Sequence, residues 1–237
     1  MQTRLFVPCA LYEGAAVELS GSQLHYLKNV LRASVGDTVF AFNGIDGEFS
    51  GTVDVLNKKN ACIRIRNLTK KQEFPAPVRL FFTPLKRDCS DLLIEKATEL
   101  GVTELHPVLT DFTAINRTNA DRMQNIVVEA CAQSRRLSIP EIYPITPLQS
   151  VLNEWSEKNG LLLHLDESGD GDTFKRAVGD IAADDAVSFL IGPEGGFSPE
   201  ERERLKKMPF VRSVSLGEHI LRAETAGIAV LAAFLCR

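Results

Sequence analysis

A glycine-rich turn between an apolar run and an acidic helix start is the first place in this sequence where a ligand could be held. The apolar run 187–191 stops at the turn 192–196 (GPEGG), and Ser198, Pro199 and Glu201 follow with the residue types of a helix N-terminus. Three glycines within five residues allow positive φ angles and let a ligand approach the backbone closely. The pattern predicts a strand, a turn and a helix start around a binding site.

The turn lacks the residues of the common phosphate-binding loops. No Lys-Ser/Thr pair follows its last glycine, as in a Walker loop, and the G-x-G-x-x-G spacing of a Rossmann turn is absent. Glu194 at the tip, with three more acids in the next helix, would repel a phosphate. We therefore expect a nucleoside-like ligand that is neutral or locally positive. A tight strand-to-helix turn that binds no ligand is the alternative.

Two further loops with unusual composition follow predicted strands, at 166–172 (DESGDGD) and 216–225 (LGEHILRAET). In open α/β sheets, ligands bind beyond the carboxyl ends of the strands, so three such loops together favour a site. Glycine next to aliphatic residues, as in Leu216-Gly217 and Ile220-Leu221, suits a slot for a flat ring whose edge is read by backbone groups.

Strands and helices must alternate to place these loops, and from residue 79 onward they do. The predicted strands are 79–83, 104–109, 161–165, 187–191 and 211–216, and the predicted helices are 88–100, 119–136, 147–155, 173–181 and 199–207. Such alternation predicts a largely parallel sheet covered by helices on both faces. The last segment, 223–235, is apolar almost all round and should be buried in the core or against another subunit.

The front of the chain has a β pattern instead. Strands are predicted at 38–42, 49–56 and 61–68, with glycine-containing or Asn-rich turns between them, which indicates a small barrel. In the last strand, isoleucines alternate with Arg64 and Arg66, so one face should be basic. A short helix is predicted at 23–32. The segment 73–77 contains two prolines, and we divide the chain into a barrel at 1–72, a linker at 73–78 and an α/β domain at 79–237.

Composition excludes several classes of protein. The 237 residues are 44% hydrophobic and 24% charged, which is typical of a globular chain. The start has no secretory signal and no apolar run is long enough to span a membrane. Five cysteines without C-x-x-C pairing favour reduced thiols in a cytoplasmic protein and no metal site. The net charge is −4, but residues 1–72 carry +3 and the rest −7, so an anionic partner should meet the front domain.

Several motifs, taken together, resemble the SPOUT superfamily of S-adenosylmethionine-dependent RNA methyltransferases. These are GPEGGFS at 192–198, LG at 216–217 with ILRAETA at 220–226, KATELGV at 96–102, EACAQSRR at 129–136 and HYLKNVLR at 25–32. The likeness covers nearly the whole chain. It is greatest to the bacterial members that methylate N3 of a uridine in small-subunit ribosomal RNA.

The resemblance implies a PUA-like barrel followed by a methyltransferase domain with a C-terminal trefoil knot, a fold that periodicity alone does not show. It also implies a cytoplasmic homodimer without a membrane partner, which acts on ribosomal RNA of the small subunit. The cofactor would be S-adenosylmethionine, held in the knotted cleft. Carried over position by position, its expected contacts are Leu165, Ile191, Gly192, Glu194, Gly195, Gly196, Leu216, Gly217, Ile220, Leu221 and Arg222.

Two residues are candidates for the chemistry that this resemblance implies. Uracil N3 must lose a proton before it can accept a methyl group, and a nearby cation would stabilise the resulting anion. Arg222 is our candidate for the cation or for orienting the base, and Glu224 is our candidate for the proton acceptor. A structural ion pair at the start of the last helix is the alternative for both.

The expected RNA contacts are basic side chains: Arg4, His25, Arg32, Lys86, Arg135 and Arg136. Ordinary solvated surface charge is the alternative for each of them. Two other functions stay open at this point, a non-enzymatic RNA-binding or ribosome assembly factor and an α/β enzyme acting on a small metabolite. The intact glycine turn counts against the first, and the basic front barrel counts against the second.

Overall fold

The computed structural model describes residues 3–30, 32–167, 171–182 and 184–236. The chain forms two compact units. The first consists of Met1–Phe74 with Cys131–Ile139, and the second of Pro75–Ala130 with Pro140–Arg237. Residues 131–139 therefore pack with the front of the chain, although the sequence places them within the α/β domain.

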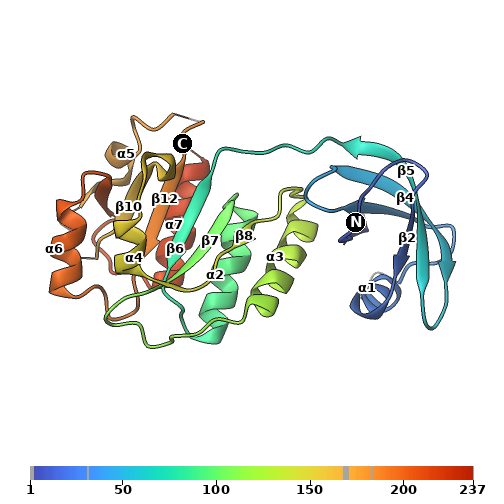
Figure 1. Ribbon diagram of the computed structural model, residues 1–237, viewed down its shortest axis with the longest axis horizontal. Coiled ribbons are helices and arrows are strands. Elements are labelled where there is room, and N and C mark those ends of the chain that lie inside the picture. Colours follow the sequence, from blue (N-terminus) through green and yellow to red (C-terminus); the bar gives the residue numbers. More distant parts are fainter. Residues whose placement is uncertain (1–2, 31, 168–170, 183, 237) are drawn as a thin grey trace. The chain divides into compact units, whose positions relative to one another are not determined.

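The first unit is built on one mostly antiparallel sheet (Figure 1). Within the described residues its strand order is β1-β3-β4-β5-β2, and only the β1–β3 pair is parallel. The predicted alternation in β5 is present, since Ile63 and Ile65 are fully buried while Arg64 and Arg66 lie on the other face. The strands are β1 (Arg4–Phe6), β2 (Ala16–Leu19), β3 (Thr38–Phe42), β4 (Glu48–Leu56) and β5 (Ala61–Lys70).

The helix predicted at 23–32 differs from the observed one. Helix α1 (Gly21–His25) begins earlier and continues as a π-helical turn, Tyr26–Val30. Arg32 has a φ of 52°, a left-handed conformation that cannot extend a right-handed helix, and Leu31 lies outside the described residues. His25 and Arg32 therefore do not share one face of a regular helix.

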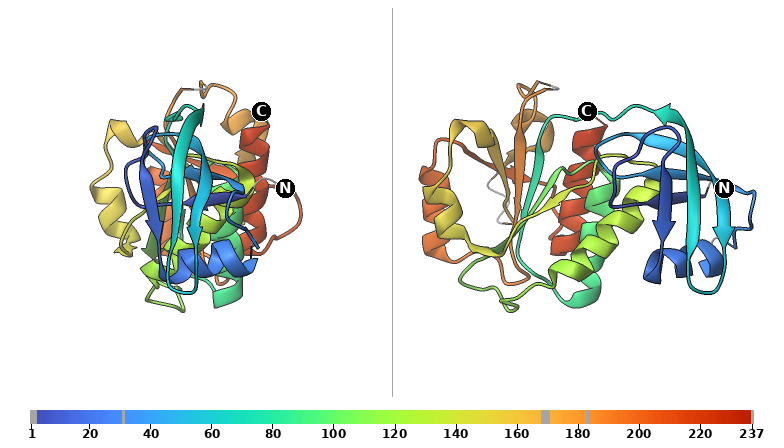
Figure 2. Two further views of the ribbon diagram at one scale, coloured as in Figure 1. Left: turned by 90° about the vertical axis from the view of Figure 1, so that its right-hand side faces the viewer. Right: turned by 45° about the vertical axis from the view of Figure 1, so that its right-hand side comes forward.

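The second unit is a parallel sheet with helices on both faces (Figure 2). In the described part of the chain its strand order is β11-β13-β10-β12-β6-β7-β8, and β9 pairs with β7. The predicted strands are all present. The strands are β6 (Val78–Phe82), β7 (Glu104–Leu109), β8 (Glu141–Ile142), β9 (Thr146–Pro147), β10 (Leu161–Leu165), β11 (Asp172–Thr173), β12 (Val187–Ile191) and β13 (Val211–Ser215).

The helices of the second unit cover the sheet as the alternation predicts. Helices α4 and α6 pack on one face, where Leu148, Leu152 and Leu205 belong to a cluster with Phe197. Helices α2 and α7 pack against each other, and α7 also contacts β12. The helices are α2 (Arg87–Glu99), α3 (Ala120–Ser134), α4 (Leu148–Asn153), the 3-10 helix Glu157–Asn159, α5 (Phe174–Ala177), α6 (Pro199–Lys207) and α7 (Ala223–Leu235).

One predicted helix is much shorter than expected. The segment 173–181 forms only α5. The chain turns after Ala177, and this turn contains Gly179, a poor helix former. The last segment is helical as predicted, and its buried residues include Gly227, Val230 and Leu231, whereas Leu235 is exposed. In the part of the chain that the structure covers, every helix is too short or too polar to cross a membrane.

The topology brings the three unusual loops together. Strands β13, β10 and β12 are neighbours, and all their pairings are parallel, so their carboxyl ends meet at one edge of the sheet. The loops that follow these strands start at Asp166, Gly192 and Leu216. The predicted convergence of the loops is thus confirmed.

Candidate functional site

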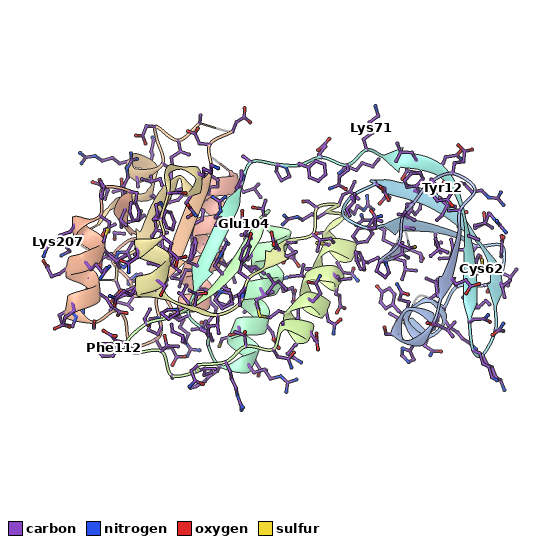
Figure 3. All side chains as sticks on the ribbon, in the orientation of Figure 1. Tyr12, Cys62, Lys71, Glu104, Phe112 and Lys207 are labelled. Carbon is purple, nitrogen blue, oxygen red and sulfur yellow. The ribbon has the colours of Figure 1, made fainter. Side chains whose placement is uncertain are left out.

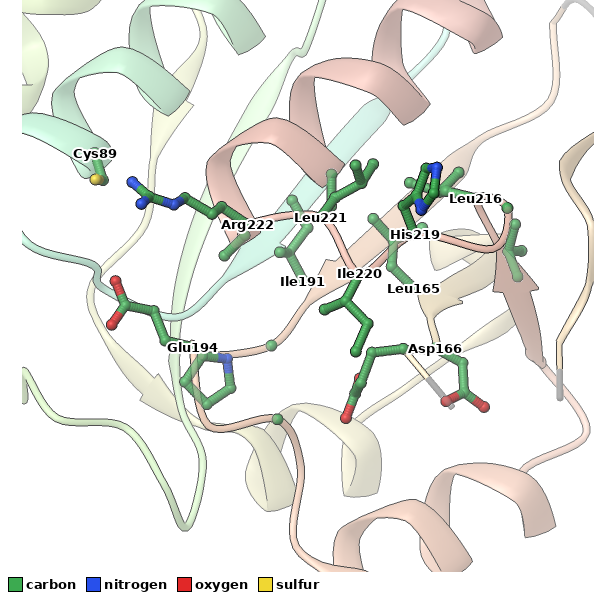
Figure 4. A pocket seen from close by; sticks show the side chains of 18 of the residues that line it. Cys89, Leu165, Asp166, Ile191, Glu194, Leu216, His219, Ile220, Leu221 and Arg222 are labelled. Atoms are coloured by element: carbon green, nitrogen blue, oxygen red, sulfur yellow. The ribbon is translucent and has the colours of Figure 1, made fainter. Parts of the chain in front are cut away.

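A cavity of about 730 Å³ lies at the carboxyl ends of β10, β12 and β13 (Figure 4). The starts of α2 and α7 close the remaining sides. Its size is within the range of pockets that bury a drug-sized ligand. Its lining residues are Lys86, Cys89, Leu165, Asp166, Glu167, Ile191, Gly192, Pro193, Glu194, Gly196, Val214, Leu216, Gly217, Glu218, His219, Ile220, Leu221, Arg222, Ala223 and Ala226.

Ten of the eleven predicted cofactor contacts line this cavity. Gly195 is the exception, because the position of a Cβ there faces Phe112 Cβ at 3.6 Å instead of the cavity. Phe112 belongs to the loop after β7 (Figure 3). The sequence motifs thus meet at one cavity, although Leu165 and Arg222 are 57 positions apart in the sequence.

Local hydrogen bonds hold the glycine turn in place. Ser198 caps α6, accepting from the backbone N–H of Glu201, while the Glu201 carboxylate accepts from the N–H of Ser198, so the predicted capping box is present. The Ser198 hydroxyl also donates to Asp111 Oδ2 at 2.5 Å, and the N–H of Asp111 donates to Glu201. These bonds tie the turn to the loop after β7.

Two glycines of the turn are hard to replace. A Cβ at Gly192 would lie 2.6 Å from the ring of Phe197, which is fully buried. A Cβ at Gly196, whose φ is 71°, would lie 2.4 Å from Oε1 of Glu167. The buried ring at Gly192 cannot move aside, whereas the end of the flexible Glu167 side chain can, so at Gly196 the left-handed φ is what favours glycine.

The middle of the cavity is apolar. Leu165 and Ile191 are buried at the ends of β10 and β12, and Leu216 and Leu221 are half-buried across from them. Ile220 is 82% exposed and belongs to the same wall (Figure 4). Aliphatic surface together with free backbone groups is what a flat heterocyclic ring requires.

One end of the cavity is charged. Glu194, Arg222 and Cys89 lie there, and the Arg222 side chain extends between the other two (Figure 4). Burial raises the pKa of the Cys89 thiol, and a hydrogen bond to Glu224 and the negative charges of Glu224 and Glu194 raise it further, whereas Arg222 lowers it. The thiol therefore stays protonated at neutral pH, and the three charged groups Glu194, Arg222 and Glu224 all lie within electrostatic reach of it.

Glu224 lies behind the cavity wall. It is in the first turn of α7, is 7% exposed and is not among the residues that line the cavity. Its charge raises the pKa of the neighbouring Cys89 thiol, and the thiol lines the cavity whereas Glu224 does not. Arg222 is exposed and precedes the helix as its N-cap residue, so the two predicted catalytic residues have different access to a ligand.

A buried histidine lies next to the carboxyl end of β10. His164 is 2% exposed, its Nδ1 is 3.3 Å from the Ser213 hydroxyl, and its ring meets the edge of Phe197. Burial lowers the pKa of His164 to about 4, although the neighbouring Asp166 carboxylate favours protonation. The imidazole is therefore neutral at physiological pH, and it packs with the sheet instead of lining the cavity.

Arg4 and Arg136, two of the six predicted RNA contacts, are turned inward. Arg4 is 4% exposed, pairs with Glu48 at 2.7 Å and donates to the carbonyls of Cys131 and Ala132 at the end of α3. Its guanidinium also covers the ring of Phe42 at 4.5 Å. Arg4 therefore stabilises the first unit, in place of the RNA contact that the sequence suggested.

Burial lowers the pKa of the half-buried Arg136, whose Nε donates to the Ser138 hydroxyl at 2.9 Å. The remaining predicted RNA contacts are exposed: His25, Arg32, Lys86 and Arg135. Lys86 lines the cavity, so this predicted RNA contact shares the cavity with Arg222.

Sequence reasoning missed Cys89, Asp166 and His219 as cavity residues. Asp166 and His219 lie in loops that the sequence singled out, so their position directly after strands was an available signal. Cys89 offered no such signal, because it lies on the first turn of α2 and reaches the cavity only through the packing of α2 against α7. Within the described residues, no cluster of His, Cys, Asp and Glu could hold a metal ion, and all five cysteines are free.

Comparison with known proteins identifies the family. Residues 72–235 match the model of an RNA methyltransferase domain, and residues 19–66 match that of an RNA methyltransferase PUA domain. The ribosomal RNA small subunit methyltransferase E of Rickettsia conorii is 34% identical over 97% of this chain and 93% of its own, and that of Synechocystis is 32% identical over 98% and 77%.

Solved structures agree with this assignment. A ribosomal RNA small subunit methyltransferase E from Neisseria gonorrhoeae, bound to S-adenosyl methionine, is 29% identical, with a TM-score of 0.87 over 100% of this chain and 98% of its own. A methyltransferase from Legionella pneumophila in complex with the same cofactor is 28% identical, with the same TM-score and coverage. The chain belongs to the RNA methyltransferase family that includes the ribosomal RNA small subunit methyltransferases E.

Proposed function

We propose that this protein transfers a methyl group from S-adenosylmethionine to N3 of a uridine in small-subunit ribosomal RNA. The observation that carries the proposal is that ten of the predicted cofactor contacts, Arg222 among them, line one cavity. The relatives named as small subunit methyltransferases and the structures with bound S-adenosylmethionine support it. The knot is an expectation of the family, and we include it in the proposal.

The cavity suits this cofactor chemically. Among the described residues that line it, four are acidic, namely Asp166, Glu167, Glu194 and Glu218, whereas Lys86 and Arg222 are the basic ones. A site with this balance favours a cation over a phosphate. S-adenosylmethionine supplies a methyl group that its positive sulfonium makes electrophilic.

We assign the adenine to the apolar middle of the cavity. Leu165, Ile191 and Leu221 provide flat aliphatic surface, and Gly217, which has no side chain and a φ of 116°, lets a ring approach the backbone of 216–217. The Gly217 N–H and C=O bond to the Ser215 hydroxyl at 3.3 and 3.4 Å, and the ring edge would share these groups. The remaining cofactor contacts proposed are Gly192, Glu194, Gly196, Leu216, Ile220 and Arg222, all of which line the cavity, and Gly195, which shapes the turn.

Arg222 orients the target base in this proposal. Its exposed guanidinium lies at the charged end of the cavity, where it can donate to a uracil carbonyl oxygen and stabilise the negative charge that appears when N3 loses its proton. The uridine must be unpaired or flipped out to reach this depth. The exposed basic residues His25, Arg32, Lys86 and Arg135 are the proposed contacts to the RNA backbone.

The proposal includes a homodimer. Leu92 of α2 and Leu235 of α7 are 41% and 61% exposed, on two helices that pack together, so a second copy could cover them. Light scattering should give twice the monomer mass, and Leu92→Glu should reduce it to the monomer mass. Leu68→Glu, at a comparably exposed leucine of β5, is the matched control. The proposed ribosomal substrate places the protein in the cytoplasm.

The proposal is tested by mapping methylated uridines in ribosomal RNA by mass spectrometry, from cells with and without the protein. Loss of one N3-methyluridine from the small-subunit RNA is the expected result, and an unchanged map would contradict the proposal. In vitro, Arg222→Ala should reduce methyl transfer by about 10²-fold or more, as removal of one oxyanion donor does. Calorimetry should show S-adenosylmethionine binding within about threefold of the wild type, a factor worth less than 1 kcal/mol.

A further inference from the structure

Two carboxylates lie near Arg222, and only one of them can reach a substrate. Glu194 is exposed at the tip of the glycine turn and lines the cavity, whereas Glu224 is buried in the first turn of α7 behind Cys89. We propose that Glu194, and not Glu224, is the catalytic residue that accepts the N3 proton of the uridine. This inference rests on the proposed function and assigns one further role within the same site.

Access is the first reason to set Glu224 aside. A general base must come within hydrogen-bond distance of the proton that it removes. Glu224 is 7% exposed and lies outside the cavity lining, next to the Cys89 thiol, whose pKa its charge raises. We assign Glu224 a positioning role, in which it holds the thiol and the start of α7 in place.

The other acids of the cavity are less suitable. Asp166 is 5% exposed and lies beside His164, and Glu167 pairs with Arg202 at 3.9 Å. His219 lies at the opposite end of the cavity from Arg222 (Figure 4), and Glu218 is its neighbour in the sequence. Glu194 is thus the carboxylate that shares the charged end of the cavity with the proposed base-orienting arginine.

The surroundings of Glu194 leave its oxygens available. Among the residues that the structure describes, none donates a hydrogen bond to its side chain, and the groups at its end of the cavity are Lys86, Cys89 and Arg222. The two cations favour the anion that uracil forms, and the Cys89 thiol, whose pKa is raised, does not compete for the proton. Exposure to solvent lets Glu194 release the proton to water after each turnover.

The proposed step balances in atoms and charge. The N3–H proton moves to a carboxylate oxygen of Glu194, and the N3 electron pair forms the new bond to the methyl carbon. The bond between that carbon and the sulfonium sulfur breaks, and its electron pair stays on the sulfur, which becomes a neutral thioether. Arg222 donates to the uracil oxygen that carries the negative charge in between.

The test compares single-turnover methyl transfer by Glu194→Gln, Glu224→Gln and the wild type between pH 6 and 10. Glu194→Gln should lower the rate at neutral pH by about 10²–10⁴-fold, the range of general base catalysis. The deficit should shrink as pH rises, because uridine N3 then ionises in solution. Glu200→Gln, at an exposed acid of the first turn of α6 outside the cavity lining, is the matched control and should keep wild-type rates.

Binding is measured separately, without turnover. Affinity for S-adenosylmethionine, measured by calorimetry, and affinity for RNA without cofactor should change less than about threefold in Glu194→Gln, below 1 kcal/mol, because glutamine keeps the shape of this cavity-lining side chain. A wild-type pH profile in Glu194→Gln would overturn the inference, and weaker cofactor binding with that unchanged profile would leave Glu194 with its proposed cofactor contact alone. A wild-type protein that methylates no uridine would instead contradict the proposed function.

Discussion

Replacing Gly192 with alanine should destabilise the second unit, whereas the same replacement at Gly195 should not. The two glycines belong to one turn, and neither has a φ in the left-handed region, so backbone strain plays no part. They differ in what a Cβ would meet. At Gly192 the atom would lie 2.6 Å from the ring of Phe197, and at Gly195 its nearest neighbour would be Phe112 Cβ at 3.6 Å, an ordinary contact.

The size of the effect follows from the rigidity of the neighbour. Phe197 is fully buried in a cluster with Leu190 and Leu205, so its ring cannot move without disturbing the core. Overpacking of this kind costs about 1–3 kcal/mol. Alanine also stabilises by about 0.4–1 kcal/mol through the unfolded chain, equally at both sites. The difference between the two variants is therefore the overpacking alone, about 1–3 kcal/mol.

The assay uses the single tryptophan of the sequence. Trp155 packs against the cluster that contains Phe197 and stacks on Phe210 with ring centroids 5.0 Å apart, so its fluorescence reports unfolding of this unit. For a chain of this size each kcal/mol shifts Tm by about 2–4 °C. We expect Gly192→Ala to melt about 2–12 °C below Gly195→Ala, with both measured without cofactor.

Equal melting temperatures for the two variants would refute the packing argument. A lower Tm for Gly195→Ala than for Gly192→Ala would do so more strongly, because the contact at Gly195 would then be the tighter one. The slope of the unfolding free energy against urea concentration should be the same in Gly192→Ala as in the wild type. A changed slope would indicate an effect on the compactness of the unfolded or native state, and the comparison would then be repeated with Gly192→Ser.

Two further predictions concern buried charge and pH. Arg4→Met should lower the unfolding free energy of the first unit by about 3–5 kcal/mol in urea, because the Glu48 carboxylate loses its cation. Arg66→Met, at an exposed arginine of β5, should change it by less than about 0.5 kcal/mol. Burial lowers the pKa of His164 to about 4 in the folded protein, whereas in the unfolded chain it is about 6.5. As pH falls below 6.5, the unfolded chain therefore binds a proton that the folded protein does not, and this favours unfolding. The unfolding free energy should therefore fall by up to about 3 kcal/mol between pH 6.5 and 4, and a slope that persisted in His164→Gln would contradict this origin.

Local patterns predicted much of this fold. The apolar run of β12, the capping box of α6 and the alternation of Ile63 and Ile65 with arginines in β5 all appear where the sequence placed them. Each depends on interactions between residues a few positions apart or on a period of two or about 3.6. The three loops could also be predicted to meet, because they follow strands of one parallel sheet.

Two differences from these expectations concern the helix at 23–32 and the burial of Arg4. The helix predicted at 23–32 changes to a π-helical turn, and Arg32 takes a left-handed conformation. Arg4 resembles a solvated terminal cation in sequence, but the end of α3, more than 120 residues away, supplies the carbonyls that bury it. No local pattern contains that information.

The sequence by itself determined the elements, the glycine turn and the membership of a methyltransferase family, since these follow from composition, spacing and motif. Only the tertiary structure decided which side chains face the cavity. Packing of α2 against α7 brings Cys89 to the wall and leaves Glu224 behind it, while Glu194 and Arg222 stay accessible. Two glutamates that are alike in sequence thus differ in exposure, and exposure limits which of them can exchange a proton with a substrate.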